Sequence, residues 1–128
     1  VDIPRRCASR ITPSHSSARV FFGAMIARTR STRISAPPPG SDVYLLARLW
    51  AFYPILELEK GKTYRLHLTA MDYNHGFSLQ PANINIQMVP GFEHVVTVTP
   101  NQSGTYSVVC NEYCGINHHT MVGRIYVK

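Results

Sequence analysis

The chain has 128 residues and a mass of 14.4 kDa, a length typical of one domain that can bury its own core. Hydrophobic residues make up 45% and charged residues 16%, which excludes disorder of the whole chain. The longest apolar run in the first half, residues 20–27, is far shorter than the ~20 residues of a membrane-spanning helix. We therefore expect a globular domain that does not cross a bilayer by itself.

The formal net charge of +6 comes from the first 41 residues, which contain seven Arg and one acidic residue. Residues 42–128 contain six Lys or Arg and six Asp or Glu, so this part is neutral. Nor do aromatic residues alternate with basic ones, as they do in proteins that bind single-stranded nucleic acid. The high isoelectric point therefore gives no reason to expect a nucleic-acid-binding domain.

Residues 3–41 contain no acidic residue and ten Ser or Thr, and they end in Pro37-Pro38-Pro39-Gly40. Such a proline run interrupts helices and strands. We expect residues 1–41 to form an irregular basic arm and residues 42–128 to form the folded domain. The arm's composition fits a flexible leader, an organelle-targeting segment or a docking arm for a partner subunit equally well. Cys7 lies in this arm, and we interpret it as a bystander.

From Asp42 onward, apolar and polar residues alternate in short segments separated by turns rich in Gly and Pro. The expected strands, in chain order, cover residues 43–50, 56–59, 64–69, 75–79, 84–88, 96–99, 106–110 and 125–127. Seven or eight short strands without a long helix predict an all-β fold, and we expect an antiparallel sandwich or barrel.

A loop between the last two expected strands contains Cys110, Cys114, His118 and Met121 at spacings of four, four and three. Thiolate, imidazole and thioether donors together favour copper over magnesium, calcium or manganese. Zinc is the competing metal, but structural zinc sites use Cys and His rather than Met. A Cys110–Cys114 disulfide is the alternative without a metal.

The two cysteines also bear on the number of metal ions. A mononuclear blue-copper site uses one Cys, two His and a weak axial Met, whereas this loop offers two Cys. Two thiolates can bridge two coppers, and each copper then needs one imidazole. His118 supplies one imidazole, and His75, in Asn-His-Gly-Phe at an expected strand start, is the best candidate for the other.

These motifs resemble the CuA signature of subunit II of the haem-copper oxidases. The shared pattern is Cys-x-Glu/Gln-x-Cys-Gly-x-x-His-x-x-Met, with a His-Gly or His-Ser upstream at a strand start, and residues 110–121 and 75–76 match it. The stretch 75–91 is most similar to the B-type oxidases of bacteria and archaea. The resemblance covers residues 43–128 and not 1–41. It implies a cupredoxin-like Greek-key β-sandwich or barrel.

The resemblance also implies a dinuclear copper centre with two coppers per chain. Six residues would bind it: His75, Cys110, Glu112, Cys114, His118 and Met121. The two cysteines would bridge both coppers. His75 and Met121 would complete one copper, and His118 with the main-chain carbonyl of Glu112 would complete the other. In an assembled oxidase the carboxylate of Glu112 would lie near a magnesium or manganese ion.

Other donor residues are expected to have no part in the site. The histidines interpreted as non-ligands are His15, His67, His94 and His119, the last because it lies at the wrong offset in the motif. The methionines expected to fill core or loop gaps are Met25, Met71 and Met88. The aromatic residues expected in the core are Trp50, Phe52 and Tyr53.

The function implied by the resemblance is that of subunit II of cytochrome c oxidase, an oxidoreductase in which this domain only relays electrons and carries no catalytic residue. Electrons would come from cytochrome c or a small copper protein and pass to haem in subunit I. The neutral domain predicts a mainly apolar docking surface.

The expected location is the outer face of an energy-transducing membrane, either the periplasmic side in bacteria and archaea or the mitochondrial intermembrane space. Membrane contact would come only through partner subunits or a missing helix. The alternatives are a CuA domain of another reductase, of the nitric oxide type, a free periplasmic copper electron carrier, and a copper-delivery or storage protein. The second cysteine of the loop argues against a mononuclear carrier.

Overall fold

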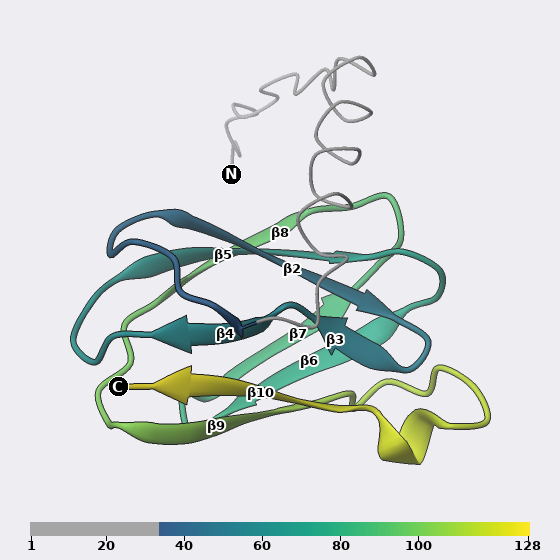
Figure 1. Cartoon of the computed structure of the whole chain (residues 1–128). Helices are drawn as coiled ribbons and strands as arrows, with labels where there is room; N and C mark the ends of the chain where they lie inside the picture. The colour runs from purple at the N-terminus through teal and green to yellow at the C-terminus, as the bar shows by residue number, and fades with distance from the viewer. Residues whose placement is uncertain (1–33) are drawn as a thin grey trace, which may run out of the picture.

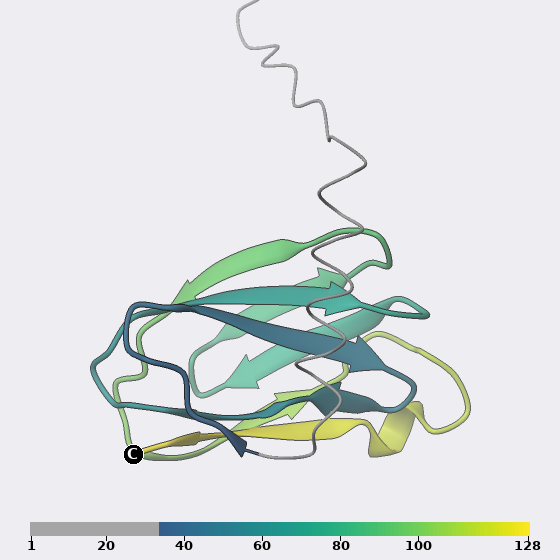
Figure 2. The ribbon, with the colours of Figure 1, turned by 45° about the horizontal axis from the view of Figure 1, so that its top comes forward.

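The computed structural model describes residues 34–128 and forms a sandwich of two β-sheets (Figure 1). The six-stranded sheet has the order β1 (Ile34–Ser35), β4 (Ile55–Leu58), β10 (Val122–Val127), β9 (Gly104–Val109), β6 (His75–Gln80) and β7 (Ile84–Met88). The four-stranded sheet has the order β3 (Ala51–Tyr53), β2 (Asp42–Arg48), β5 (Tyr64–Ala70) and β8 (His94–Val98). Figure 2 shows the two layers from a second angle.

The expected all-β class is confirmed, and each of the eight expected segments overlaps a strand. The expectation of purely antiparallel pairing is wrong, because β2 pairs parallel with β5 and β10 pairs parallel with β4. Some consecutive strands, such as β4 and β5, lie in different sheets, so part of the pairing joins strands that are far apart in the sequence. The alternation of apolar and polar residues shows which side chains lie on each face of a strand. It carries no information about whether the neighbouring strand runs parallel or antiparallel.

Two strands were not expected from the sequence. The segment 43–50, expected as one strand, ends at Arg48, and after a turn at Leu49 and Trp50 the chain returns as β3 alongside β2. The short β1 pairs parallel with β4 and lies within the segment predicted to be an irregular arm. The division into an arm of residues 1–41 and a domain of residues 42–128 stays a prediction.

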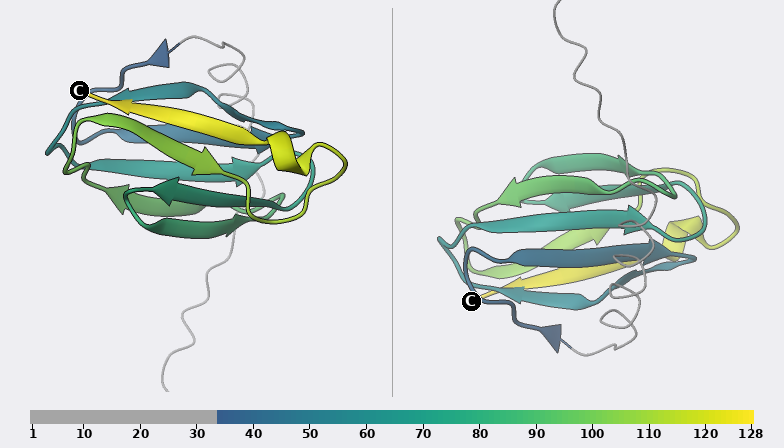
Figure 3. Two further views of the ribbon diagram at one scale, coloured as in Figure 1. Left: turned by 90° about the horizontal axis from the view of Figure 1, so that it is seen from below. Right: turned by 90° about the horizontal axis from the view of Figure 1, so that it is seen from above.

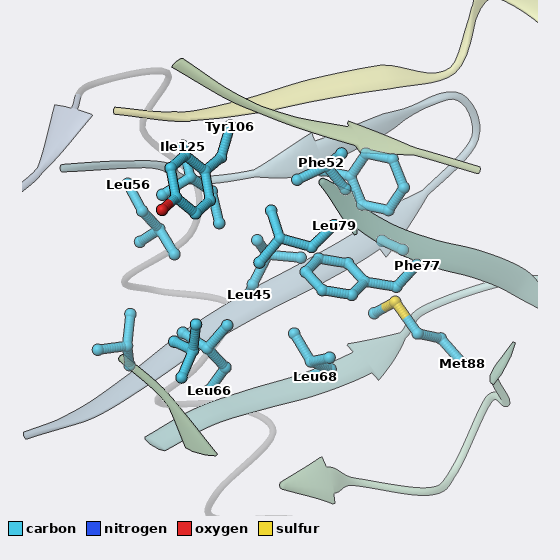
Figure 4. Close-up of a cluster of buried hydrophobic side chains, with 14 of the residues drawn as sticks. Leu45, Phe52, Leu56, Leu66, Leu68, Phe77, Leu79, Met88, Tyr106 and Ile125 are labelled. Carbon is cyan, nitrogen blue, oxygen red and sulfur yellow. The ribbon is translucent and has the colours of Figure 1, made fainter. Parts of the chain in front are cut away.

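The core lies between the sheets, where alternate residues of facing strands meet (Figure 4). Leu66 and Leu68 of β5 are fully buried, whereas Arg65 between Tyr64 and Leu66 is exposed. From the opposite sheet, Phe77 packs edge-to-face against Phe52, with ring centroids 6.1 Å apart. Each large apolar side chain buried in this way stabilises the fold by about 1.5–3 kcal/mol.

The sheet topology brings two distant segments to one end of the sandwich. β6 and β9 pair antiparallel with Ser78 opposite Val109, so the start of β6 lies beside the end of β9. The loop after β9 and the 3₁₀ turn η1 (His118–Thr120) project from this end, opposite the C-terminus (Figures 1 and 3). Within residues 34–128 the structure contains no helix with the length and hydrophobicity needed to span a membrane.

Deletion of residues 1–41 tests the predicted division of the chain. It removes β1 with its pairing to β4 and two further main-chain hydrogen bonds to the rest of the described chain, Gly40 N–H to Thr63 O and Arg65 N–H to Ser41 O, but no residue of the described core. We expect the free energy of unfolding to fall by about 2 kcal/mol or more, since each of the two bonds contributes roughly 1 kcal/mol and the β1–β4 pairing adds to them. Urea titration measures this change. Loss of copper binding in the shortened chain would show instead that the arm belongs to the folded domain.

Candidate metal centre

Two buried thiols form the middle of the candidate metal centre. Cys110 directly follows β9 and Cys114 lies four residues later, and both are free cysteines that pack into the hydrophobic core. Their Sγ atoms are 3.6 Å apart. A sulfur pair at this separation and depth presents two soft donors to a metal while the surrounding side chains exclude water.

Each thiol faces a different imidazole. His75 Nδ1 lies 3.9 Å from Cys110 Sγ, and His118 Nδ1 lies 3.5 Å from Cys114 Sγ. His75 is completely buried at the start of β6. The fold brings it beside Cys110 although the two residues are 35 positions apart in the sequence. The ligand atoms of His75, Cys110 and Cys114 lie within 4.8 Å of one another, which is a distance that a bound metal ion can bridge.

Two weaker donors complete the cluster. Met121 Sδ lies 3.7 Å from Cys114 Sγ, and the Cys110 thiol donates a hydrogen bond of 3.2 Å to the main-chain carbonyl of Glu112. Met121 is buried, whereas Glu112 is exposed. The six residues predicted as ligands therefore lie around one thiol pair, and their role as copper ligands stays a prediction.

Main-chain hydrogen bonds give the ligand loop its shape. The N–H of Cys110 donates to the carbonyl of Met121 at 3.1 Å, which closes the loop at its base. The N–H of Met121 in turn donates to the carbonyl of His118 at 3.1 Å, so the turn η1 aligns these two residues with the thiols. Gly115 has a φ of +117°, a backbone conformation that other residues rarely adopt.

Trp50 contacts this loop from the turn between β2 and β3. Its indole N–H donates to the main-chain carbonyl of Cys114 at 3.3 Å. A Cβ added at Gly115 would lie 3.4 Å from the indole nitrogen, which is an ordinary van der Waals contact, so the positive φ rather than the space accounts for the glycine. The prediction that Trp50 is a core residue is correct only in part, since it is partly buried against the core and also contacts the candidate site.

Asp72 is a site residue that the sequence analysis missed. Its Oδ1 accepts a hydrogen bond of 2.7 Å from His75 Nε2, and its carboxylate also accepts the N–H groups of Leu49 and Tyr73 at 2.8 Å. With the proton on Nε2, the lone pair of Nδ1 faces the thiols and is available to a metal. The spacing Asp-x-x-His was the available signal, because it places a carboxylate within reach of the imidazole.

The environment also sets the ionisation of two groups. Partial burial opposes ionisation of Asp72, but the hydrogen bonds from Leu49 and His75 prevail and lower its pKa below the ordinary 3.8. Burial and the neighbouring Cys110 raise the pKa of the Cys114 thiol to about 12. A metal that binds Cys114 therefore displaces a proton, and metal affinity rises with pH.

The histidines and methionines expected not to be ligands lie outside the cluster or pack in the core. His119 is exposed, and His67 lies on the outer face of the four-stranded sheet between Asp42 and Glu93. The Nε2 of His94 is buried without a hydrogen-bond partner among residues 34–128. Met88 fills the core as expected, whereas Met71 is exposed. The residues singled out earlier that lie outside the described part of the chain are Cys7, His15 and Met25.

This fold is of the cupredoxin-like class, and its donor set could hold a metal ion. Reduced rusticyanin has the same fold, with a TM-score of 0.64 and 17% identity over 89% of this chain and 96% of that chain. The periplasmic domain of subunit II of cytochrome oxidase from Bradyrhizobium japonicum gives a TM-score of 0.65 at 19% identity, covering 72% of this chain and 86% of that chain.

The family described as cytochrome c oxidase subunit II, periplasmic domain, matches residues 51–127. Cytochrome c oxidase subunit 2 of Thermus thermophilus is 34% identical over 96 residues, which cover 74% of this chain and 71% of that protein. A second subunit 2 sequence from this species is matched over 57% of its length. The chain therefore belongs to the family of cytochrome c oxidase subunit II periplasmic domains. The predicted family, the fold and the function as an electron-transfer domain of a terminal oxidase are confirmed.

Replacing Asp72 by alanine tests how His75 is oriented. We expect the free energy of unfolding to fall by about 1–3 kcal/mol, because hydrogen bonds to a carboxylate are lost. We also expect His75 to populate both neutral tautomers, measured by ¹⁵N NMR of the imidazole. Because folding lowers the Asp72 pKa, its stabilisation is present above pH ~4 and is lost as the pH falls through that lowered value. A His75 tautomer unchanged in Asp72→Ala would contradict the orienting role.

Proposed function

We propose that the chain holds a dinuclear CuA centre and relays electrons one at a time to the catalytic subunit of a terminal oxidase. The observation that carries this proposal is the pair of free thiols 3.6 Å apart, each facing a different imidazole nitrogen. A mononuclear site has a use for only one of these thiols. The arrangement thus has two thiolates for bridging and one imidazole for each copper.

The surroundings of the thiol pair support the remaining ligands. We assign His75 and Met121 to one copper and His118 with the carbonyl of Glu112 to the other, as the family resemblance implies. The Glu112 carbonyl already points at Cys110 Sγ, and the Met121 sulfur lies next to Cys114. A thioether and a carbonyl are weak donors, which suits a centre whose strong bonds come from thiolates and imidazoles.

When bound, the copper pair supplies reversible one-electron exchange. The chain's own residues hold the donors at fixed separations before a metal arrives, because His75 starts one strand, Cys110 follows its neighbour and both are buried. Asp72 keeps the His75 ring in one orientation, and Trp50 covers the loop at Cys114. Donors that are fixed in this way move little between oxidation states, and a small rearrangement favours fast electron transfer.

The surface at this end of the molecule supports docking of redox partners. Tyr113 and Ile116 on the ligand loop are 77% and 79% exposed, and Met71 and Tyr73 on the neighbouring loop are also exposed. These apolar side chains, on a part of the chain without net charge, fit an apolar docking surface with weak long-range steering. We propose cytochrome c or a small copper protein as the donor and haem in subunit I as the acceptor.

The name of the matched family supports a location on the outer, periplasmic side of the membrane. A magnesium or manganese ion at Glu112 in an assembled oxidase stays a prediction, supported by an exposed carboxylate whose main-chain carbonyl faces the thiols. A free copper carrier is the second candidate, favoured by the similarity to rusticyanin in fold. The second buried thiol argues against a mononuclear carrier of that kind.

Metal analysis of the copper-loaded chain tests the dinuclear centre. We expect two coppers per chain, a purple colour and a resonance spectrum of one electron shared by both metals. Replacing either Cys110 or Cys114 by serine should abolish this spectrum, because each thiolate would be a ligand of both coppers. One copper per chain with a localised spectrum would support the free carrier instead.

Single substitutions in the loop test the ligand register. His118→Ala should reduce copper affinity strongly, whereas His119→Ala should leave it unchanged, because of these two neighbours His118 faces a thiol and His119 is exposed. Met121→Leu should keep two coppers and shift the reduction potential, since the thioether is a weak ligand. Copper titration and potentiometry measure both effects. Copper loss in His119→Ala with normal binding in His118→Ala would show that His119, and not His118, is the ligand.

A further inference from the structure

Gly76, the residue after His75, is packed tightly against the ligand loop. A Cβ at Gly76 would collide with the side-chain oxygen of Asn111 and would lie 2.6 Å from the Asn111 nitrogen and 2.7 Å from the Glu112 nitrogen. Two of these atoms belong to the main chain, so the loop could avoid the collision only by moving as a whole. A glycine at this position therefore permits the loop to lie directly on β6.

The close approach places an N–H group on a proposed copper ligand. The main-chain N–H of Gly76 donates to Cys110 Sγ at 3.4 Å, and both residues are buried. A hydrogen bond to a thiolate sulfur withdraws electron density from it, and such bonds tune the reduction potential of copper–thiolate centres. The position of the loop over Gly76 thus bears on the electronic properties of the site as well as on its shape.

An amide pair outside the site holds the loop in this position. Asn111 Nδ2 donates to Asn85 Oδ1 at 3.0 Å, and both side chains are exposed. Asn85 lies on β7, whereas Asn111 follows β9, and β6 runs between these two strands in the sheet. The Asn111 side chain therefore crosses β6 at Gly76 and fastens the loop to the strand beyond it.

We propose that this Asn85–Asn111 clamp sets the reduction potential of the copper centre by holding the Gly76 N–H on the sulfur of Cys110. Asn85 and Asn111 are thus positioning residues that act through Gly76. The inference rests on the proposed function, because Cys110 must be a copper ligand. Without the clamp, the loop can lift from Gly76, the hydrogen bond to sulfur weakens and the thiolate regains electron density. The oxidised centre is then favoured, and the potential falls.

Potentiometric titration of the copper-loaded full chain tests the effect on the centre. Asn85→Ala and Asn111→Ala should each lower the reduction potential by a similar amount, and the two coppers and their purple absorption should remain. The double variant should show no larger shift than either single variant, because both changes remove the same bond. Gln87→Ala is the matched control, since Gln87 is exposed two residues further along β7, and its potential should equal that of the parent.

Hydrogen exchange of the copper-free chain tests the clamp without the metal. The Gly76 amide should exchange roughly tenfold faster in Asn85→Ala and Asn111→Ala, because local opening of the loop becomes easier. The same amide should exchange at the parent rate in Gln87→Ala.

These two measurements separate the possible failures. Equal potentials in all variants, or shifts that add in the double variant, overturn the proposed effect on the centre and leave the amide pair a structural contact. Unchanged exchange at Gly76 overturns the clamp itself. A parent chain that loads no dinuclear copper contradicts the proposed function, and with it any effect on the potential.

Discussion

The antiparallel pairing of β6 with β9 is the contact on which the candidate copper site depends. Its register, with Ser78 opposite Val109, brings the start of one strand to the end of the other and so places His75 beside Cys110. The core side chains Phe77 and Leu79 follow His75 on β6 and anchor it between the sheets. The burial of apolar side chains that stabilises the fold therefore also holds the His75 imidazole at its position beside the Cys110 thiol.

The second half of the site depends on a loop that closes on itself. The Cys110 N–H to Met121 carbonyl bond joins its ends, and the turn η1 brings His118 back toward Cys114. This loop has contacts on two sides, with Trp50 at Cys114 and with Gly76 at Asn111. A loop held from both sides keeps its donors in place although it lies outside the sheets, and such rigidity suits a site that exchanges electrons.

The polar groups around the thiols have different roles. Asp72 acts on the far side of the His75 ring and orients it, while the Gly76 N–H acts directly on a sulfur. The carboxylate of Asp72 is partly exposed, and its negative charge adds to the causes that raise the pKa of the Cys114 thiol. Apolar side chains on the adjoining loops, such as Tyr113 and Met71, remain at the surface beside the buried donors.

The sequence by itself determined eight of the ten strand segments in the described part of the chain, because alternation in segments such as 84–88 shows which residues face the core. It also predicted four of the six candidate ligands from their spacing, because Cys110, Cys114, His118 and Met121 lie on one short loop. The sequence did not reveal that β2 runs parallel to β5, that Asp72 orients His75, or that Asn85 reaches Asn111. The parallel pairing and the asparagine contact join residues far apart in the chain, and the histidine contact depends on how a turn is folded. Only the strand pairing and the folding of the turn in the tertiary structure decided them, because residue spacing along a chain carries no information about which distant strands become neighbours.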